Sequence, residues 1–499
     1  MTSPSPQQHT YPVTGSALGL PLIVLSALQF MVVLDGTVVN LALNRMQVEL
    51  GLSDQLRSWV VLAYALAYGG LLLLGGRLGD AFGRKRMFLG GVGAFTAASL
   101  LCGLATGPVT LQAARVLQGV GAAVASPVAM ALIVVTFAPG KTRNQAFSVF
   151  AAMTGLGSVS GLILGGALTE VSWRWIFWLN VPIGVFIVIG GLRALTVVPP
   201  QRQIKLDVTG AVLATVASTL LVFGLSMGGT GWGRPLVILP IVVGAAVLVA
   251  FFRSQRSTST GVLPLHLFRD RRRTVVFVCL VLAGAVLMAM TVQVALFVQE
   301  SLGYTPLASG FAFIPFAVGL GLGAWVAGQA VRTIAPKFLI AAGGMFMLAG
   351  FFFAQTLDAH SGYWLHLLPT ILTIATGVGL ALIPLTLCVV AGVRPEDVGP
   401  LTATSLVAQT LGGPLGLAAA AAVGESRTRS LLAGAYPAVQ ERGALSPAIR
   451  DALAAGYTQS LLVCAGLAGI MAVVALVWVR FTPAEVAEGK KAEAAAQSG

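Results

Sequence analysis

The stretch "GGRLGDAFGRKRMFLGG", residues 75–91, joins two apolar segments. Its glycines permit a tight turn, and its run of basic residues favours the cytoplasmic side of a membrane. A related stretch, "AGQAVRTIAPKFLIAAG", occupies residues 327–343, and an offset of 252 residues aligns Gly76 with Gly328. We therefore predict that the same arrangement of segments occurs twice.

The composition is that of a protein that crosses a membrane many times. Hydrophobic residues make up 57% of the 499 residues and charged residues only 9%, and the mean hydropathy is +0.89. A soluble protein carries about 25% charged residues. Apolar segments of about 20 residues, which cross about 30 Å of hydrocarbon as helices, recur along the chain. Fourteen are predicted, at 18–40, 57–77, 86–106, 110–135, 146–169, 175–195, 207–228, 235–253, 273–297, 306–330, 336–356, 364–386, 398–423 and 457–479.

The basic residues predict the orientation of these segments. With the N-terminus in the cytoplasm, 21 of the 30 Lys and Arg residues fall in cytoplasmic connections and eight in external ones. This is a strong positive-inside bias, so both termini are expected in the cytoplasm of a protein in the cell membrane. Because topology accounts for the net charge of +13, we expect no nucleic-acid partner.

No pattern in the sequence indicates a metal, a cofactor or a cleaved leader. The N-terminal "MTSPSPQQHTYPVTGS" lacks a charged start and a cleavage site, so we expect it to be retained. No group of His, Cys, Asp and Glu has metal-ligand spacing. The cysteines lie in or beside apolar segments without a paired motif, which favours packing roles for Cys102, Cys279, Cys388 and Cys464.

The repeat predicts the organisation of the chain into domains. Two parallel halves with a site between them are typical of alternating-access transporters. The predicted parts are a cytoplasmic tail (1–17), a six-helix bundle (18–195), two inserted helices (207–253), a second six-helix bundle (273–479) with an external loop (425–456), and a cytoplasmic tail (480–499).

Two charged residues of opposite sign lie inside predicted helices of the first half. Asp35 stands in "MVVLDGTVVN" (31–40), and Arg115 stands near the start of the fourth segment. Each lies about five residues from the external end of its helix, which at 1.5 Å per residue gives both a depth of about 8 Å. At about 4 Å the two charges would attract by roughly 4 kcal/mol at an effective dielectric of 20.

This pair predicts a proton-coupling site. Arg115 favours the ionised carboxylate of Asp35, whereas burial favours the protonated form. A movement that changes their separation or hydration would therefore bind or release a proton. The alternatives are a fixed structural ion pair and an acid that is hydrogen-bonded to Thr37 or Asn40.

Several motifs together resemble one known family. "GRLGDAFGRKR" (76–86) resembles the cytoplasmic loop signature of the major facilitator superfamily. Further stretches resemble its fourteen-helix drug:proton antiporter branch: "LDGTVVNLAL" (34–43), "RVLQGVGAA" (115–123), "SWRWIFWLNVPIG" (172–184) and "LGGPLGLA" (411–418). The resemblance implies an all-α polytopic membrane protein of the major facilitator fold, a proton-coupled multidrug exporter rather than an enzyme.

The resemblance also implies a conformational latch in the loop after the second helix. There the carboxylate of Asp80 would dock against the start of the thirteenth helix, near 398–401, because helix N-termini attract negative charge. The implied latch residues are Gly76, Asp80, Gly83, Arg84 and Lys85. Position 81 is Ala where the family often has a basic residue, so the local charge relay is reduced.

The fifth helix contains a stripe of glycines. Gly157, Gly161 and Gly165 recur every fourth residue, and Gly166 follows directly, which allows close helix packing. The family's antiporter signature usually has Pro after the middle glycine, and this chain has Leu162. We therefore interpret the stripe as a packing motif. In the next motif, Asn180 and Pro182 are expected to shape the start of the sixth helix.

The expected substrate is a small amphipathic molecule that binds in an apolar cavity between the halves. The interiors of the tenth and thirteenth segments contain no acidic residue, which favours neutral, weakly charged or monocationic compounds such as antibiotics. The wall residues that we predict are Gln29, Tyr64, Tyr68, Gln118, Met290, Gln293 and Gln409. A functional monomer is expected. The alternatives are a dedicated exporter of an endogenous metabolite, lipid or siderophore, and a non-transporting membrane sensor.

Overall fold

A computed structural model describes residues 19–138, 141–197, 206–257, 270–393, 395–432 and 447–486. Within these ranges the chain is helical and contains no strand. The helices are α1 (Gly19–Leu50), α2 (Asp54–Phe82), α3 (Arg84–Gly103), α4 (Pro108–Thr136), α5 (Lys141–Val171), α6 (Arg174–Trp178), α7 (Asn180–Ala194), α8 (Val208–Ser226), α9 (Pro235–Ser257), α10 (Arg271–Leu296), α11 (Pro306–Ala312), α12 (Ile314–Ala330), α13 (Pro336–Phe353), α14 (Leu368–Val390), α15 (Pro395–Leu431) and α16 (Pro447–Trp478). Short helical turns, η1 (Met227–Thr230), η3 (Phe297–Ser301), η4 (Ala354–Thr356) and η5 (Tyr363–Leu367), adjoin four of them.

The predicted number of membrane helices is confirmed. Fourteen helical segments among the described residues are long and apolar enough to span a bilayer. Two of them are interrupted. The sixth consists of α6 and α7, which meet at Leu179, and the tenth consists of α11 and α12, which meet at Phe313. Each second part has a proline in its first turns, Pro182 and Pro315, where the missing amide hydrogen is least costly.

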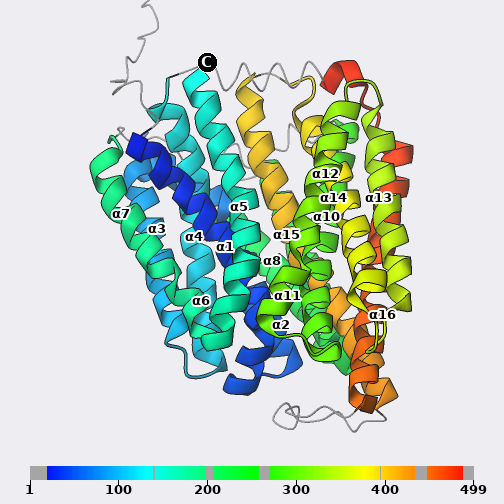
Figure 1. Cartoon of the computed structure of the whole chain (residues 1–499). Coiled ribbons are helices and arrows are strands. Elements are labelled where there is room, and N and C mark those ends of the chain that lie inside the picture. Colours follow the sequence, from blue (N-terminus) through cyan, green and yellow to red (C-terminus); the bar gives the residue numbers. More distant parts are fainter. Residues whose placement is uncertain are drawn as a thin grey trace, which may run out of the picture.

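The helices form two bundles whose internal packing is repeated (Figure 1). In the first bundle α4 packs on α2 and α3, and α1 packs on α5. In the second bundle α14 packs on α12 and α13, and α10 packs on α15. The two sets correspond in chain order, which confirms the predicted fold of two six-helix bundles. Apolar residues on all sides of these helices suit an environment of lipid and neighbouring helices.

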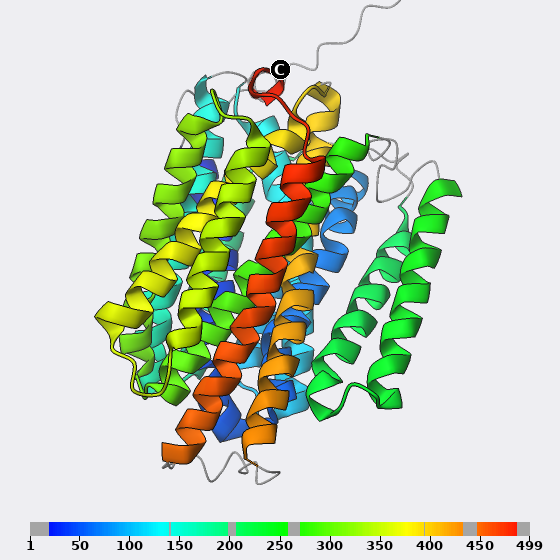
Figure 2. The same ribbon diagram turned by 90° about the vertical axis from the view of Figure 1, so that its right-hand side faces the viewer.

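The two inserted helices, α8 and α9, stand at the side of the molecule (Figure 2). They pack on each other, and α8 also contacts α2 of the first bundle and α15 of the second. Only 17% of the 18-residue apolar stretch of α9 is buried in the protein, against 61% of the corresponding stretch of α1. The outer helix of the pair therefore presents most of its apolar surface outward.

The turn within residues 75–91 depends on one glycine. α2 continues to Phe82, and α3 begins at Arg84 with no intervening loop. Gly83 between them has φ +100°, a conformation that residues with a β-carbon rarely adopt. Its backbone N–H donates to the Gly79 carbonyl and closes α2, so this single residue reverses the chain.

The buried apolar residues distinguish the two ends of the molecule. One continuous cluster extends along the whole second bundle, with residues such as Val286 and Phe297, and joins the first bundle only near the end where α2 begins, predicted to be external, through residues such as Leu41 and Leu62. At the other end, where α1 begins, a separate cluster contains only residues of the first bundle, among them Leu28. The bundles therefore share a core at the predicted external end.

Parts of the predicted domain map lie outside the described residues. These include the tails before residue 19 and after residue 486, much of the linkers around the inserted pair, and residues 433–446 of the predicted external loop. Both flanks of that loop are helical, because α15 extends to Leu431 and α16 begins at Pro447.

Candidate functional site

Asp35 lies at the centre of a buried polar cluster in the first bundle. Its side chain is 0% exposed on α1. Oδ2 accepts a hydrogen bond from Arg115 Nη1 of α4 at 2.7 Å. Oδ1 accepts from Gln118 Nε2 of α4 at 2.7 Å and from Asn180 Nδ2 of α7 at 2.8 Å. Three donors from two other helices thus converge on one carboxylate, which is the arrangement that an ionised acid requires in an apolar interior.

Arg115 is fixed by more than the carboxylate. Nε donates to the Val60 carbonyl of α2 at 2.8 Å, and Nη1 also donates to Gln118 Oε1 at 2.7 Å. The guanidinium lies over the Tyr64 ring, 4.4 Å from its centroid, and Tyr64 in turn stacks on Tyr68 at 5.9 Å. This planar cation on an aromatic face is an arrangement that lysine does not reproduce. The charge of Arg115 is therefore positioned by α1, α2 and α4 together.

Asn180 can serve either protonation state of Asp35. Its Nδ2 donates to the carboxylate, while its Oδ1 is buried with no hydrogen-bond partner among the described residues. A protonated carboxyl group is a donor and needs an acceptor. A half-turn of the Asn180 amide would present Oδ1 to that donor, and the two amide orientations are interchangeable in shape. The cluster thus contains a group that can follow the proton without moving a helix.

The alternative partners that the sequence offered to Asp35 are used elsewhere. Thr37 Oγ1 donates to the carbonyls of Val33 and Leu34 at 3.1 and 3.0 Å. Asn40 Nδ2 donates to the Gly36 carbonyl at 3.4 Å. Both side chains donate to backbone carbonyls of α1. The hydrogen bonds to Asp35 come instead from α4 and α7.

The residues predicted to line the substrate cavity lie in several places. Gln118 belongs to the Asp35 cluster, where it also donates to Ser99 Oγ at 2.8 Å. Tyr64 of α2 lies against the Arg115 guanidinium, and Tyr68, one turn along α2, stacks on Tyr64. Gln29 on α1 donates to Thr154 on α5 at 3.0 Å, an exposed contact between two helices of the first bundle.

Three more of the predicted wall residues lie in the second bundle. Met290 and Gln293 are buried on α10, and Gln293 lines a pocket between α2, α15 and α16 near the predicted external end. Gln409 is half-buried on α15, where its backbone lies against Gly284 of α10. The predicted set is therefore not one continuous surface.

The glycine stripe of α5 lies against α1. An added β-carbon at Gly161 would lie 1.8 Å from Thr37 Oγ1, and one at Gly165 would lie 2.8 Å from the Val38 side chain. Gly157 faces Phe30 and Val33 in the same way. Gly166 faces the other bundle, where the backbone of Leu307 on α11 would be 2.6 Å away. The first three glycines bring α5 close to the helix that carries Asp35, and the fourth brings the bundles together.

The predicted latch residues interact within the first bundle. Asp80 pairs with Arg84 one turn along, with Nη2 to Oδ1 at 2.9 Å. Lys85 Nζ donates to the carbonyls of Leu192 and Leu195 at the end of α7 at 2.8 and 2.6 Å. The start of α15 is helical, but its side chains before Leu401 lie outside the described residues, so the predicted docking of Asp80 stays a prediction.

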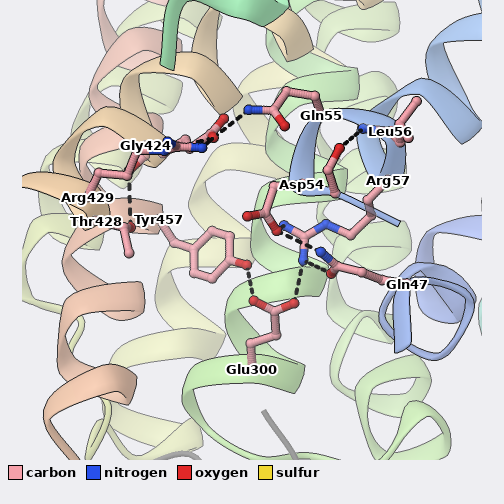
Figure 3. Close-up of polar contacts among 12 residues, drawn as sticks. Gln47, Asp54, Gln55, Leu56, Arg57, Glu300, Gly424, Thr428, Arg429 and Tyr457 are labelled. Atoms are coloured by element: carbon pink, nitrogen blue, oxygen red, sulfur yellow. Dashed lines mark hydrogen bonds and ion pairs between the residues drawn. The ribbon is translucent and has the colours of Figure 1, made fainter. Parts of the chain in front are cut away.

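A second polar cluster lies at the predicted external end, between the bundles (Figure 3). Glu300 of η3 accepts hydrogen bonds from Arg57 Nη1 of α2 and from the Tyr457 hydroxyl of α16, each at 2.5 Å. Arg57 also donates to Gln47 Oε1 of α1 at 2.7 Å. Nearby, Gln55 of α2 donates to Glu425 of α15 at 2.6 Å. Both carboxylates join the bundles here.

Sequence reasoning missed this second cluster and the contribution of Asn180. Glu300 and Arg57 stand at the external ends of predicted helices, where exposure is expected, yet they are 5% and 7% exposed. A signal was present, because an acid and a base stand at external ends of helices from different halves. Asn180 was assigned to the start of a helix, and no spacing in the sequence links it to Asp35.

Comparisons with known proteins place this arrangement in a family. The model of the Major Facilitator Superfamily matches residues 25–421. The MFS-type transporter EfpA of Mycobacterium tuberculosis is 44% identical over 481 residues, which cover 96% of this chain and 89% of EfpA. The puromycin resistance protein pur8 of Streptomyces alboniger is 37% identical over 462 residues, which cover 92% of this chain and 90% of that protein.

A solved structure of low sequence identity has the same fold. The crystal structure of a bacterial homologue of the human lysosomal transporter Spinster, in an inward-facing and occupied conformation, superposes with a TM-score of 0.63. It is 17% identical, and the match covers 93% of this chain and 97% of that one. With the repeated bundles, the fourteen helices and the family match over most of its length, the chain belongs to the Major Facilitator Superfamily.

Proposed function

We propose that this membrane transporter exports lipophilic small molecules in exchange for protons by alternating access. The single observation that carries the proposal is the buried carboxylate of Asp35, which is surrounded by donors from Arg115, Gln118 and Asn180. An acid inside a membrane helix is costly and is usually retained for proton or ion transfer. We take Asp35 as the proton-binding group and Arg115 as the cation that controls it.

Proton binding at Asp35 requires its surroundings to rearrange. In the present arrangement all three groups donate, so the carboxylate is satisfied only when it is ionised. A bound proton adds a fourth donor and removes the charge that holds Arg115, which is also anchored to α2 through Val60. Protonation would thereby loosen the contact of α1 with α4, while Asn180 of α7 could turn its amide and accept from the protonated acid. This is the local change that alternating access needs.

The arrangement of the two bundles supports an alternating-access cycle. Their shared apolar core and the Glu300 cluster join them at the end predicted to be external. The separate core of the first bundle lies at the end predicted to be cytoplasmic. This state would take up substrate from the cytoplasm, and both termini would lie on that side. The latch at Asp80 would close the cytoplasmic end in the opposite state.

The relatives and the residues around the bundles indicate the class of substrate. One relative is a puromycin resistance protein, which favours antibiotics and similar amphipathic molecules. α12 and residues 401–424 of α15 contain no acidic residue. Neutral, weakly charged or monocationic compounds therefore suit the cavity better than dications. We propose a monomer in the cell membrane as the working unit.

Everted membrane vesicles from a host that lacks its own drug pumps test the proposal. Respiration acidifies the lumen, and addition of a transported compound should release protons from it. Asp35→Asn should abolish this release while the protein stays in the membrane, because the amide cannot carry the proton. Glu170→Gln, a matched change at an exposed carboxylate of α5, should leave it intact.

Two results would count against the proposal. Full transport driven by a pH gradient in Asp35→Asn would remove the assigned proton carrier. Binding of compounds without any flux would favour a sensor. A panel of antibiotics in which only one metabolite evokes proton release would identify a dedicated exporter instead of a multidrug one.

A further inference from the structure

Among the described residues, Glu300 is a buried carboxylate that contacts both bundles. It lies in η3, at the external end of α10, and only 5% of the residue is exposed. Its two oxygens have partners on opposite sides, Arg57 from the first bundle and Tyr457 from the second (Figure 3). One carboxylate therefore connects the two bodies that must separate if the external end is to open.

The charged and polar groups around Glu300 come from α1, α2, α15 and α16. Asp54 lies 3.7 Å from Arg57 Nη2, so two carboxylates share this arginine. Gln47 of α1 accepts from Arg57 and donates to Asp54 at 2.7 Å. From α15, Glu425 forms an ion pair with Arg429. The Tyr457 hydroxyl is the titratable group that α16 contributes.

The ionised form of Glu300 favours the closed external end. A carboxylate accepts from Arg57 and Tyr457 at once, and the charged hydrogen bond to Arg57 is the stronger kind. A proton on Glu300 removes the negative charge and leaves Arg57 bonded to Gln47 within its own bundle. The loss of charge therefore weakens the contact between bundles and spares the contacts within the first bundle.

We propose that Glu300 is a second proton-binding site, which holds the external end closed while it is ionised and releases it on taking up a proton. The inference rests on the proton-coupled exchange proposed above. The proton comes from the external solution, binds a carboxylate oxygen of Glu300, and breaks the ion pair with Arg57. Return of the proton to the solution restores the pair and the closure. Asp35, inside one bundle, would carry the proton across, and Glu300 would govern opening.

A single cysteine beside the gate can report its opening. Ser58 on α2 is 8% exposed and lines the pocket that Arg57 and Tyr457 also border. Ser58→Cys is introduced after replacement of Cys102, Cys279, Cys388 and Cys464, all of which are buried. Intact cells are labelled with a membrane-impermeant maleimide at external pH of about 8 and about 5.5. Val109→Cys, at a position that is 79% exposed at the same end, corrects for the pH dependence of the thiol reaction.

We expect the corrected labelling rate to rise about tenfold at the lower pH, because a larger fraction of the molecules has an open external end. Glu300→Gln, which mimics the protonated acid, should label rapidly at both pH values. Tyr457→Phe keeps the carboxylate and should keep the pH response. Where Glu300→Gln does not reach the membrane, Arg57→Gln removes the same ion pair from the other side and should also label rapidly at both pH values.

The outcomes separate this inference from the proposed function. A Glu300→Gln or Arg57→Gln variant with the pH response of the unchanged protein would overturn the second proton site. The labelling requires no transport, so the response should persist in an Asp35→Asn background. If vesicles show no proton exchange although labelling depends on Glu300, the export proposal fails and the gate stands.

Discussion

Asp35 and Glu300 are both buried carboxylates paired with an arginine, but they occupy different kinds of places. Asp35 and its donors lie inside the first bundle, on α1, α4 and α7. Glu300 lies between the bundles, with Arg57 on one side and Tyr457 on the other. A change of charge at Asp35 would therefore act within one bundle, whereas a change at Glu300 would act on the contact between the two bundles.

The repeated fold makes the location of the first charge pair informative. The offset of 252 residues that aligns the halves places Leu287 opposite Asp35 and Leu367 opposite Arg115. The helix packing is therefore repeated in the second bundle, while this ion pair is not. An apolar counterpart forms the same helix contacts without the cost of burying charge. The pair in the first bundle is thus not needed for the fold, which supports a role in transport.

The largest effect that would test this comparison comes from removing one arginine at a time. Arg115→Met would leave Asp35 as an uncompensated charge inside a bundle, at a cost of about 3–5 kcal/mol. Arg57→Met should cost less, because opening of the external end can hydrate Glu300. Chemical unfolding of the purified variants in detergent measures both losses.

The double variant Asp35→Asn with Arg115→Met supplies the control for this prediction. It removes both charges and should recover much of the lost stability. Equal losses in Arg115→Met and Arg57→Met would contradict the distinction between a site within a bundle and a site between bundles.

A second prediction concerns the amide that faces Asp35. Asn180→Ala removes a hydrogen bond to a charged group, worth about 1.5–3 kcal/mol. The transport rate should fall by about tenfold or more. Because Asn180 can hydrogen-bond to either the ionised or the protonated form of Asp35, the pH profile of transport should also shift or narrow. Asn44→Ala, at a half-buried position near the external end of α1, should change neither. A pH profile unchanged in shape would leave Asn180 as a structural residue only.

A third prediction compares Gly→Ala substitutions, each of which adds one methyl group, at a contact within a bundle and at a contact between bundles. Overpacking in a close contact costs about 1–3 kcal/mol. Gly161→Ala should lower stability, because the new methyl meets Thr37 of α1. Gly166→Ala should instead open the external end and raise labelling of the Ser58→Cys reporter, because it meets the backbone of Leu307. At Gly155 nothing lies within 4 Å, so Gly155→Ala is the matched control. Identical behaviour of the first two variants would contradict the assignment.

The smallest effect is expected at Asp80. Its side chain is 29% exposed and pairs with Arg84 across the Gly83 turn, and such partly hydrated pairs contribute about 0.2–1 kcal/mol. Asp80→Asn should therefore leave unfolding nearly unchanged while it slows transport, if the carboxylate docks on α15 in the other state. Unaltered transport would reduce Asp80 to a local helix contact.

The fold could be predicted from the sequence because the hydropathy and the flanking charges of each helix are properties of that helix alone. The length of an apolar run and the side on which arginines gather are local properties. The helix ends were less accessible. α1 continues ten residues beyond the predicted end at Asn40, as far as Leu50, because hydropathy detects the part within lipid and not the part that packs on neighbouring chain.

The candidate site could be predicted only as far as depth and charge specify it. Asp35 and Arg115 stand at matching depths with opposite charges, and the structure brings them together. Asn180 donates to Asp35 across 145 residues of chain, and Arg57 pairs with Glu300 across 243. Those contacts depend on how bundles and helices turn toward each other, which neither spacing nor hydropathy records. Gln118 was expected to face substrate, yet its amide bonds the acid and Ser99.

The position of the inserted pair restricts how a lipid-dissolved molecule can reach the space between the bundles. α8 leans on α2 and α15 together and so shields the seam where those two helices meet. The described helices place no such cover over the opposite seam, beside α5 and α11. A compound that enters the space between the bundles from the bilayer would therefore have to pass on the side of α5 and α11, because α8 and α9 cover the other side.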